Sequence, residues 1–229
     1  MKLSVILPSI RPERLPRWLA SFEKSYSGES EIIVIGPYET ILHPDTFKSP
    51  MGPFLARSNF KGMVDYGSPV RCQQMALEEA TGNLIHRAVD DSLYLPGEMD
   101  RAVAMMTDDR RLIVAPKYTE SNASVDRTHK DFQDMNNPAF YYIAYHKLAV
   151  NPQFDPDWKL LNFGIIHEDM LMEVGGWDCQ FESVAIAELD LAVRLQMAGA
   201  RIELTDNIVL ECDWMPGHEG DETVGNAHR

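Results

Sequence analysis

Cysteine is scarce in this chain of 229 residues, and its three cysteines follow no pattern that would bind zinc or build a disulfide framework. Cys72, Cys179 and Cys212 are far apart, and no two of them form a CxxC pair. Disulfide-rich domains and structural zinc sites use even numbers of cysteines or closely spaced pairs. We therefore expect a protein of a reducing compartment and predict a cytoplasmic location.

Long apolar runs are also absent. No run approaches the ~20 residues of a membrane-spanning helix, and the N-terminal run ends at Pro8, too early for a signal peptide. Hydrophobic residues make up 45% and charged residues 24% of the chain, as in ordinary globular proteins. The sequence predicts a soluble protein with one sizeable core and no transmembrane segment, and it leaves the oligomeric state open.

Basic residues are few in the last third of the chain. The net charge is −14, and residues 151–229 hold 16 Asp and Glu against 4 Lys and Arg, whereas residues 1–150 are nearly neutral. A protein that binds nucleic acid needs Lys and Arg along the path of the phosphates. The distribution argues against a broad nucleic-acid surface and leaves room for a local basic pocket in the first two thirds.

The first half of the chain alternates apolar runs with amphipathic segments. Apolar runs rich in β-branched residues are typical of strands buried on both faces of a parallel sheet. They predict strands at residues 3–7, 31–35, 60–64, 84–89 and 111–115, with shorter ones at 201–204 and 208–210. Three-to-four spacing predicts helices at residues 14–24, 69–80, 96–106 and 185–198, the last with Ile186, Leu189, Val193 and Met197 on one face. This order predicts an α/β fold with a mostly parallel sheet.

Two adjacent carboxylates, Asp90 and Asp91, follow the predicted strand 84–89. Open α/β sheets bind ligands at the carboxyl ends of their strands, and adjacent carboxylates repel unless a cation or hydrogen bonds offset the repulsion. Mg2+ or Mn2+ does so and completes its shell with substrate phosphates. The alternative is a surface turn in which Asp caps the next helix, which Pro96 would open after a tight connection at residues 92–95.

Five stretches, in this order, carry a resemblance to a known family. They are SVILPS, EIIVI, the block SPVRCQQMALEEATGNLIHRAVDDSLYLPG, then GGWD and ELDLAVRLQMAGARI. Together they resemble the family 2 glycosyltransferases of the GT-A fold, over roughly residues 3–36 and 68–204. The resemblance implies a GT-A-like (Rossmann-like), mostly parallel central sheet flanked by helices, with an acceptor-side region toward the C-terminus.

The same resemblance implies how one domain would be divided. A single GT-A-like domain would span residues 1–229. Residues 1–115 would form the half that binds the nucleotide sugar, and residues 116–211 the acceptor and catalytic half. Residues 212–229 would be a flexible tail or a lid.

The resemblance also implies roles for single residues. Asp91 matches the carboxylate that binds a divalent cation bridging the donor's diphosphate. Asp90 matches its neighbour, which contacts the ribose or the waters of the metal or joins Asp91 as a metal ligand. Glu188 matches the general base, with Asp190 following on the same helix; the alternative for both is helix surface charge. His218 stands where some relatives complete the metal shell, and the alternative is a solvent-exposed tail histidine.

Contacts to the donor are the least defined part of the resemblance. Pro8, Ser9 and Arg11 end the first strand, and Arg71 and Gln74 lie on the helix before the Asp pair. We expect these five residues to contact the nucleotide or its diphosphate. The acidic residue that family members usually carry after the second strand is missing here, as is the aromatic residue after the first. The nucleobase is therefore not identified, and a UDP-sugar is the default donor.

These expectations combine into one function. The protein would use Mn2+ or Mg2+ to transfer a sugar from a nucleotide-diphosphate sugar to a hydroxyl of a saccharide, a lipid-linked carrier, a protein or a modified base. Glu188 would deprotonate the acceptor, and the cation on Asp91 would stabilise the leaving diphosphate, with inversion at the anomeric carbon. The alternatives are a retaining enzyme, a nucleotidyltransferase, and a catalytically silent module that binds nucleotide or glycan.

Overall fold

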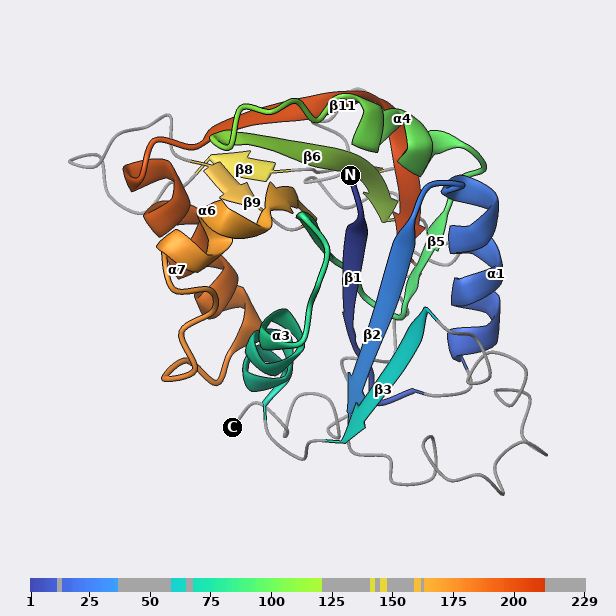
Figure 1. Cartoon of the computed structure of the whole chain (residues 1–229), viewed down its shortest axis with the longest axis horizontal. Coiled ribbons are helices and arrows are strands. Elements are labelled where there is room, and N and C mark those ends of the chain that lie inside the picture. Colours follow the sequence, from blue (N-terminus) through green and yellow to red (C-terminus); the bar gives the residue numbers. More distant parts are fainter. Residues whose placement is uncertain are drawn as a thin grey trace.

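A central sheet with helices on both faces organises the described part of the chain (Figure 1). This computed structural model describes residues 1–11, 14–36, 59–64, 68–120, 141–142, 145–147, 159–161 and 163–212. The strand order is β3-β2-β1-β4-β10-β6-β11-β5, with β7 paired to β6. The α/β fold predicted from the sequence is confirmed.

The first half of the sheet is parallel throughout. Its strands are β1 (Leu3–Pro8), β2 (Ser30–Gly36), β3 (Phe60–Val64) and β4 (Leu84–Arg87). β1 lies between β2 and β4, and β2 pairs with β3, all in parallel. All four strands were predicted to within two residues at each end; β1 and β2 are continuous apolar runs buried on both faces, whereas β3 is only partly buried.

The second half of the sheet is mixed, and here the predicted strands need correction. It contains β5 (Ser92–Tyr94), β6 (Leu112–Glu120), β10 (Ile165–His167) and β11 (Arg201–Cys212). β10 runs antiparallel between β4 and β6, and β11 is parallel to β6. The expected connection at residues 92–95 is wrong, because β5 pairs antiparallel with the end of β11. The two strands predicted at 201–204 and 208–210 are one strand with register shifts between them.

Three short strands complete the description of this region. They are β7 (Tyr141–Tyr142), β8 (Tyr145–Lys147) and β9 (Lys159–Leu161). β7 extends the main sheet antiparallel to β6, whereas β8 and β9 form a separate two-stranded sheet. The rest of the chain between residues 121 and 158 lies outside the described residues.

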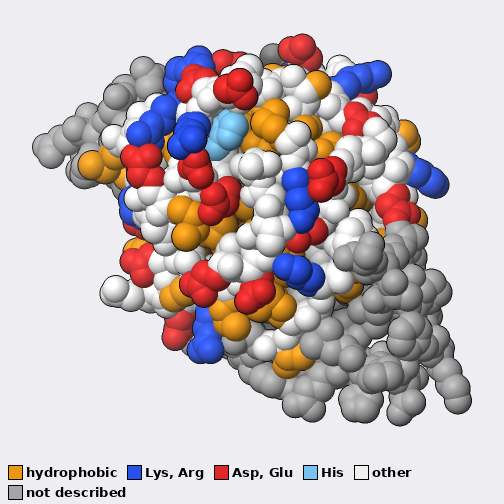
Figure 2. Space-filling view, in the orientation of Figure 1, with side chains coloured by type: hydrophobic (Ala, Val, Ile, Leu, Met, Phe, Trp, Pro, Cys, Tyr) orange, Lys and Arg blue, Asp and Glu red, His pale blue; other side chains and the backbone are white. Residues whose placement is uncertain are grey.

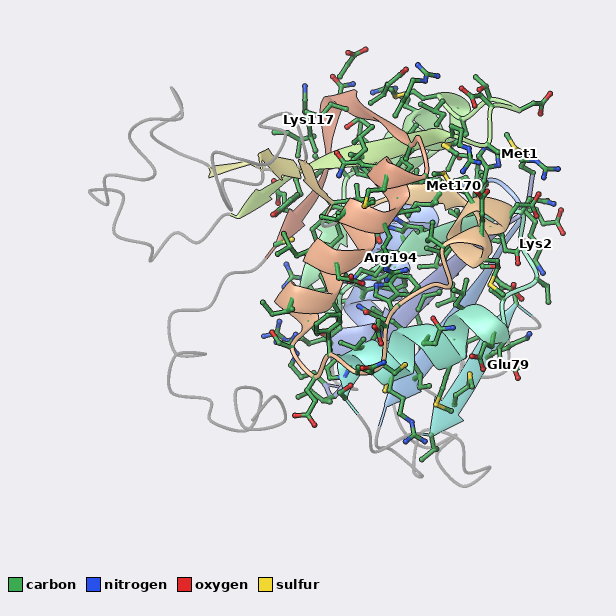
Figure 3. The ribbon with its side chains drawn as sticks, turned by 90° about the vertical axis from the view of Figure 1, so that its left-hand side faces the viewer. Met1, Lys2, Glu79, Lys117, Met170 and Arg194 are labelled. Carbon is green, nitrogen blue, oxygen red and sulfur yellow. The ribbon has the colours of Figure 1, made fainter. Side chains whose placement is uncertain are left out.

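Helices cover the two faces of the sheet. They are α1 (Leu15–Ser25) and α4 (Glu98–Ala104) on one face, and α3 (Pro69–Glu78), α6 (Glu168–Glu173) and α7 (Val184–Met197) on the other. Figure 3 views the second face, with Met170 of α6 and Arg194 of α7 near its centre. The prediction that Pro96 opens a helix is wrong: α4 begins at Glu98, after Gly97 takes a left-handed φ of 73°.

The buried face of α7 differs from the predicted apolar face. Ile186 and Met197 are 48% and 72% exposed. The helix instead buries Ala187, Leu191 and Leu195, which are spaced four residues apart. Apolar residues surround this helix on several sides, so periodicity alone did not identify the inward face. The correction matters because Glu188 turns inward with this face.

The surface in Figure 2 carries acidic and basic side chains interspersed with one another. That face shows no broad basic area, in line with the charge distribution of the sequence. None of the helices in the described ranges is long and apolar enough to cross a membrane.

Candidate active site

The Asp pair lies at the edge of the sheet where β1, β2 and β4 end, which we call the C-terminal edge (lower edge in Figure 1). The register of these strands is continued beyond them by backbone hydrogen bonds, from Ala88 N–H to Ile6 O at 2.8 Å and from Ser9 N–H to Ile35 O at 2.9 Å. Ser9, just after β1, therefore lies beside the residues that follow β4. This is the edge at which α/β sheets bind ligands.

Asp90 is buried and held by two residues from the β1 side. Ser9 Oγ donates a hydrogen bond to Asp90 Oδ2 at 2.6 Å, and Arg11 Nε donates to the same oxygen at 3.2 Å. Arg11 Nη2 donates to Asp90 Oδ1. The Arg11 backbone N–H donates to Ser9 Oγ at 3.1 Å, which fixes the turn between them. Asp90 thus forms a bidentate, charge-assisted pair that uses both of its oxygens.

Asp91 is more open than Asp90. Its side chain is 32% exposed, and its Oδ2 lies 3.6 Å from Arg11 Nη2, beyond hydrogen-bond distance. Burial raises the pKa of Asp91, the positive charge of Arg11 opposes the rise, and the negative charge of Asp90 adds to it. Asp91 is therefore a carboxylate whose negative charge is only partly compensated, at the edge where a ligand would bind.

The turn that carries the Asp pair is braced from inside. Ser92 stands where many relatives of the resembled family carry a third acid, but it is buried and its Oγ donates to Val89 O at 2.8 Å. Behind the turn, the ring of buried His86 bridges Gly164 O at 3.0 Å and Tyr94 Oη at 2.8 Å. Burial lowers the pKa of His86 to about 4, so this ring is neutral at pH 7. These contacts fix the height and direction of the two carboxylates.

Glu188 lies on the α7 face of the sheet and is held through one oxygen. Gln73 Nε2 and Trp177 Nε1 each donate to Oε1 at 3.2 Å, and Arg87 Nε lies 3.1 Å from the same atom. From the described part of the chain, Oε2 receives no hydrogen bond. Burial raises the pKa of Glu188, although all three neighbours favour the charged form. The carboxylate is thus oriented by one oxygen, with the other left for a substrate.

The Gly-Gly-Trp motif brings Trp177 to Glu188. Gly175 and Gly176 have φ values of 85° and 66°, a left-handed conformation that other residues rarely adopt. A Cβ on Gly176 would lie 2.2 Å from Gln74 Oε1. The absence of that Cβ lets Gln74 Oε1 accept the Trp177 backbone N–H at 2.8 Å. The motif therefore allows the close packing that places Trp177 Nε1 as a hydrogen-bond donor to Glu188.

Arg87 is the ion-pair partner of Glu188 and was missed by the sequence analysis. It is the last residue of β4, pairs with Glu188, and lies 5.8 Å from the centre of the Phe163 ring. Its charge also lowers the pKa of Asp91, against the effect of burial. A cavity of ≈ 10 Å³ beside Glu188 includes Arg87 and has room for about one water. A charged residue inside a predicted buried strand was the available signal.

Asp190 and Arg194 form a pair on the surface of α7. Arg194 Nε and Nη2 lie 2.8 and 2.6 Å from Asp190 Oδ2, and Arg194 Nη1 donates to Val174 O at 2.5 Å (Figure 3). Arg194 thus holds Asp190 and also ties α7 to the end of α6 through Val174. Asp190 is about one quarter exposed.

Other predicted site residues are placed less closely. Pro8 ends β1. Arg71 is exposed in the first turn of α3, and Gln74 is engaged with Trp177. His218 lies outside the described residues, as does the predicted tail or lid beyond Cys212.

A divalent cation at the C-terminal edge would find one accessible carboxylate. Among the residues that the structure describes, no group of three or more His, Cys, Asp or Glu side chains could hold a metal ion. Mg2+ commonly binds one or two carboxylates and completes its shell with water and substrate phosphates. Asp91 fits that second arrangement, so the residues suit a cation shared with a bound diphosphate rather than one enclosed by the protein.

The opposite edge of the sheet carries a different carboxylate cluster, centred on buried Glu31 of β2. Ser4 Oγ and the Thr81 backbone N–H each donate to Glu31 Oε1 at 2.6 Å, and the Thr81 hydroxyl donates at 2.9 Å. Lys2 Nζ lies 3.3 Å from Oε2. Burial alone would raise the pKa of Glu31, but these hydrogen bonds lower it to about 2. This edge also borders a groove of ≈ 760 Å³ that Thr81, Arg110 and Asp169 help to line.

Among known proteins, solved structures of TarS are similar to this chain in fold. No family model and no curated protein matches the chain. A crystal structure of S. aureus TarS 1-349 has a TM-score of 0.63 at 16% identity, and the match covers 93% of this chain and 60% of that one. Structures of TarS 1-349 in complex with UDP and with UDP-GlcNAc give TM-scores of 0.60 and 0.61, also at 16% identity, and cover 63% and 60% of those chains.

The aligned region accounts for nearly all of this chain but for less than two thirds of the TarS chains. At 16% identity the likeness concerns the course of the backbone. The chain therefore shares the fold of the aligned region of TarS.

Proposed function

We propose that the protein is a glycosyltransferase that moves a sugar from a nucleotide-diphosphate sugar to an acceptor hydroxyl. The observation that carries this proposal is that two carboxylates of different character lie around the end of β4: Asp91 follows this strand, and Glu188 forms an ion pair with Arg87, its last residue. Asp91 is partly exposed with its charge only partly compensated, and Glu188 is buried and oriented through one oxygen. The UDP and UDP-GlcNAc complexes of TarS, which shares the fold, support a nucleotide-sugar donor.

The donor side is assigned to the C-terminal edge. Asp91 would hold a divalent cation, Mn2+ or Mg2+, with His218 as a further ligand, and that cation would neutralise charge on the leaving diphosphate. Arg11, held by Asp90 together with Ser9, lies beside Asp91 and presents its N–H groups to the same edge. Five donors in a planar fork suit Arg11 for phosphate oxygens. Arg71, exposed in the first turn of α3, would add charge from another element.

The acceptor side is assigned to Glu188. A general base works best when its pKa is close to the operating pH, and burial moves the pKa of Glu188 upward in that direction. Arg87, Trp177 and Gln73 hold Oε1, so that Oε2 would accept the proton of the attacking hydroxyl. A base that acts directly on the acceptor fits inversion at the anomeric carbon. Asp190, engaged with Arg194, is the weaker candidate for this step.

Release of nucleotide from a panel of nucleotide sugars tests the function. We expect turnover by the wild-type protein with a UDP-sugar and a divalent cation, and a loss of at least ~100-fold in Asp91→Asn. The pKa of Asp91 is raised, so its charge does not favour the folded state, and the variant should melt no lower than wild type. NMR of the product's anomeric proton would then distinguish inversion from retention.

Each other outcome identifies an alternative. Binding of nucleotide without turnover of any donor would indicate a silent binding module. Release of pyrophosphate from a nucleoside triphosphate would indicate a nucleotidyltransferase. Full activity of Asp91→Asn would contradict the role given to that carboxylate.

A further inference from the structure

Arg11 lies near both carboxylates of the Asp pair, but it hydrogen-bonds only to Asp90. It bonds to both oxygens of Asp90, and Ser9 adds a 2.6 Å hydrogen bond to one of them. The same Nη2 atom lies 3.6 Å from Asp91 Oδ2. Within the described residues, Arg11 is therefore the closest cationic group recorded for Asp91, and it reaches that carboxylate from a position fixed by Asp90.

We propose that Arg11 is the counter-charge of Asp91 in the ligand-free protein, and that Asp90 is the positioning residue that holds Arg11 and not a ligand of the cation. This inference rests on the proposed function and deepens it. A divalent cation then binds Asp91 tightly only together with a nucleotide diphosphate. The metal-binding role predicted for Asp90 from the sequence is replaced by this one.

The hydrogen bonds of Asp90 carry the first part of the proposal. Asp90 is 5% exposed, and its Oδ1 and Oδ2 already accept three bonds from Ser9 and Arg11. A cation could bind Asp90 only by displacing a bidentate guanidinium, and such charge-assisted pairs are about twice as strong as neutral hydrogen bonds. Asp91 requires no such displacement, because its contact with Arg11 is longer than a hydrogen bond.

Charge carries the second part. A divalent ion on Asp91 would stand within a few ångströms of the Arg11 guanidinium, and like charges at that separation repel. A diphosphate supplies at least two negative charges that both the ion and the unused N–H groups of Arg11 can bind. A bound diphosphate attracts both the cation and Arg11, which offsets the repulsion between them. Nucleotide and cation should therefore bind with positive coupling.

Titration of the nucleotide-free protein with Mn2+, followed by the EPR signal of the free ion, tests the proposal without any turnover. Arg11→Met should bind Mn2+ about five- to tenfold more tightly than wild type, because the competing charge is gone. In EDTA, the same variant should bind UDP more weakly than wild type. Asp91→Asn should lose Mn2+ binding in either background.

A double-mutant comparison distinguishes whether Asp90 positions Arg11 or is itself a ligand of the cation. If Asp90 acts only through Arg11, adding Asp90→Asn to Arg11→Met should change Mn2+ affinity by about twofold or less. Arg11→Lys keeps the charge but not the fork, so it should weaken UDP binding in EDTA and leave Mn2+ affinity near the wild-type value. Arg110→Met is the matched control, since Arg110 forms an exposed pair with Asp169 at the other edge and should affect neither ligand.

Two results would overturn the inference. One is Mn2+ affinity in Arg11→Met that is equal to or lower than wild type, and the other is loss of Mn2+ binding on adding Asp90→Asn to that variant. Either result would leave the proposed glycosyl transfer in place if wild type still binds UDP and Mn2+ together. A wild-type protein that binds neither ligand alone nor the two together would contradict the donor site itself, and with it both proposals.

Discussion

At each edge of the sheet a serine hydroxyl donates a 2.6 Å hydrogen bond to a buried carboxylate, but the surroundings of the two carboxylates differ. At the edge where β1 begins, Glu31 receives hydrogen bonds from Ser4 and Thr81, and its pKa falls to about 2. At the edge where β1 ends, Ser9 and Arg11 satisfy Asp90, while the neighbouring Asp91 keeps a raised pKa. Glu31 and Asp90 are both satisfied by the fold alone, whereas Asp91, beside Asp90, is left for a ligand.

The difference teaches how to read buried acids in this protein. A lowered pKa marks a group whose charge stabilises the folded state, and a raised pKa marks one whose charge the fold holds at a cost. Functional sites are enriched in the second kind. By this criterion Asp91 and Glu188 are candidates for the site, as geometry also indicates, whereas Glu31 belongs to the scaffold.

The largest effect should come from the buried acid of the site. We expect Glu188→Gln to lower kcat by ~100- to 10,000-fold, because the variant cannot take up the acceptor's proton. Steady-state kinetics at saturating donor would measure it, with circular dichroism to establish that the variant folds. Retention of more than about one tenth of wild-type kcat would mean that another group acts as base and that Glu188 only supports Arg87.

The scaffold acid should give the reverse result. We expect Glu31→Gln to lower the free energy of unfolding by about 3 kcal/mol at pH 7 and to leave kcat nearly unchanged. The folded-state pKa of about 2 lies below the ordinary 4.5, so the stabilisation is complete above pH 4.5 and is lost as the pH falls toward 2. Urea unfolding at a series of pH values would measure both quantities.

His86 provides an internal control for that pH series. Its pKa is lowered from 6.5 to about 4, so the unfolded chain takes up a proton first, and stability falls as the pH drops from 6.5 to 4. The loss of stability between pH 6.5 and 4 should persist in Glu31→Gln, whereas the loss between pH 4.5 and 2 should become smaller. If both losses disappear together, the two edges are not independent.

Substitution of Gly176 should have an intermediate effect, on both stability and activity, because Gly176 packs against Gln74, the residue that positions Trp177. We expect Gly176→Ala to cost about 1–3 kcal/mol of stability, since φ is 66° and the added Cβ would meet Gln74. It should also lower kcat, because Trp177 is displaced from Glu188. Gly199→Ala is the matched control: Gly199 has a φ of 92° with open space around its Cβ position, so it should lose stability but not kcat.

The smallest effect is expected at Asp190, whose pair with Arg194 is partly exposed. We expect Asp190→Asn to lower the free energy of unfolding by less than about 1 kcal/mol, as is usual for such pairs. Activity should fall no more than a few-fold, measured with the same donor. A loss comparable to that of Glu188→Gln would move Asp190 from the scaffold into the site.

The sequence predicted the elements whose signals are local. β1 and β2 follow from continuous apolar runs, and the Asp pair from its place after the predicted strand 84–89. β5 could not be predicted, because a three-residue segment becomes a strand only through its partner in β11. The inward face of α7 was likewise decided by packing, since Ile186 and Ala187 are both apolar and only the smaller one is buried.

Within the candidate site, residue identities were easier to predict than their partners. Glu188 and Asp91 came from the resemblance, but the ion pair of Glu188 with Arg87 joins residues from β4 and α7. The hold of Arg11 on Asp90 joins residues 79 positions apart in the sequence. Such contacts depend on the register of the sheet, which no local pattern specifies.

The antiparallel position of β10 beside β4 has a consequence for how such a protein can diversify. Ile166 pairs with Ile85, so the chain that departs after β4 returns one strand away. The long excursion between them therefore starts and finishes at adjacent points of the sheet. Its loops could be lengthened, shortened or exchanged with little demand on the four parallel strands. In the proposed transferase, such changes beyond the turn at Asp90 and Asp91 would alter the acceptor side, while Ser9 and Arg11 next to β1 keep their places.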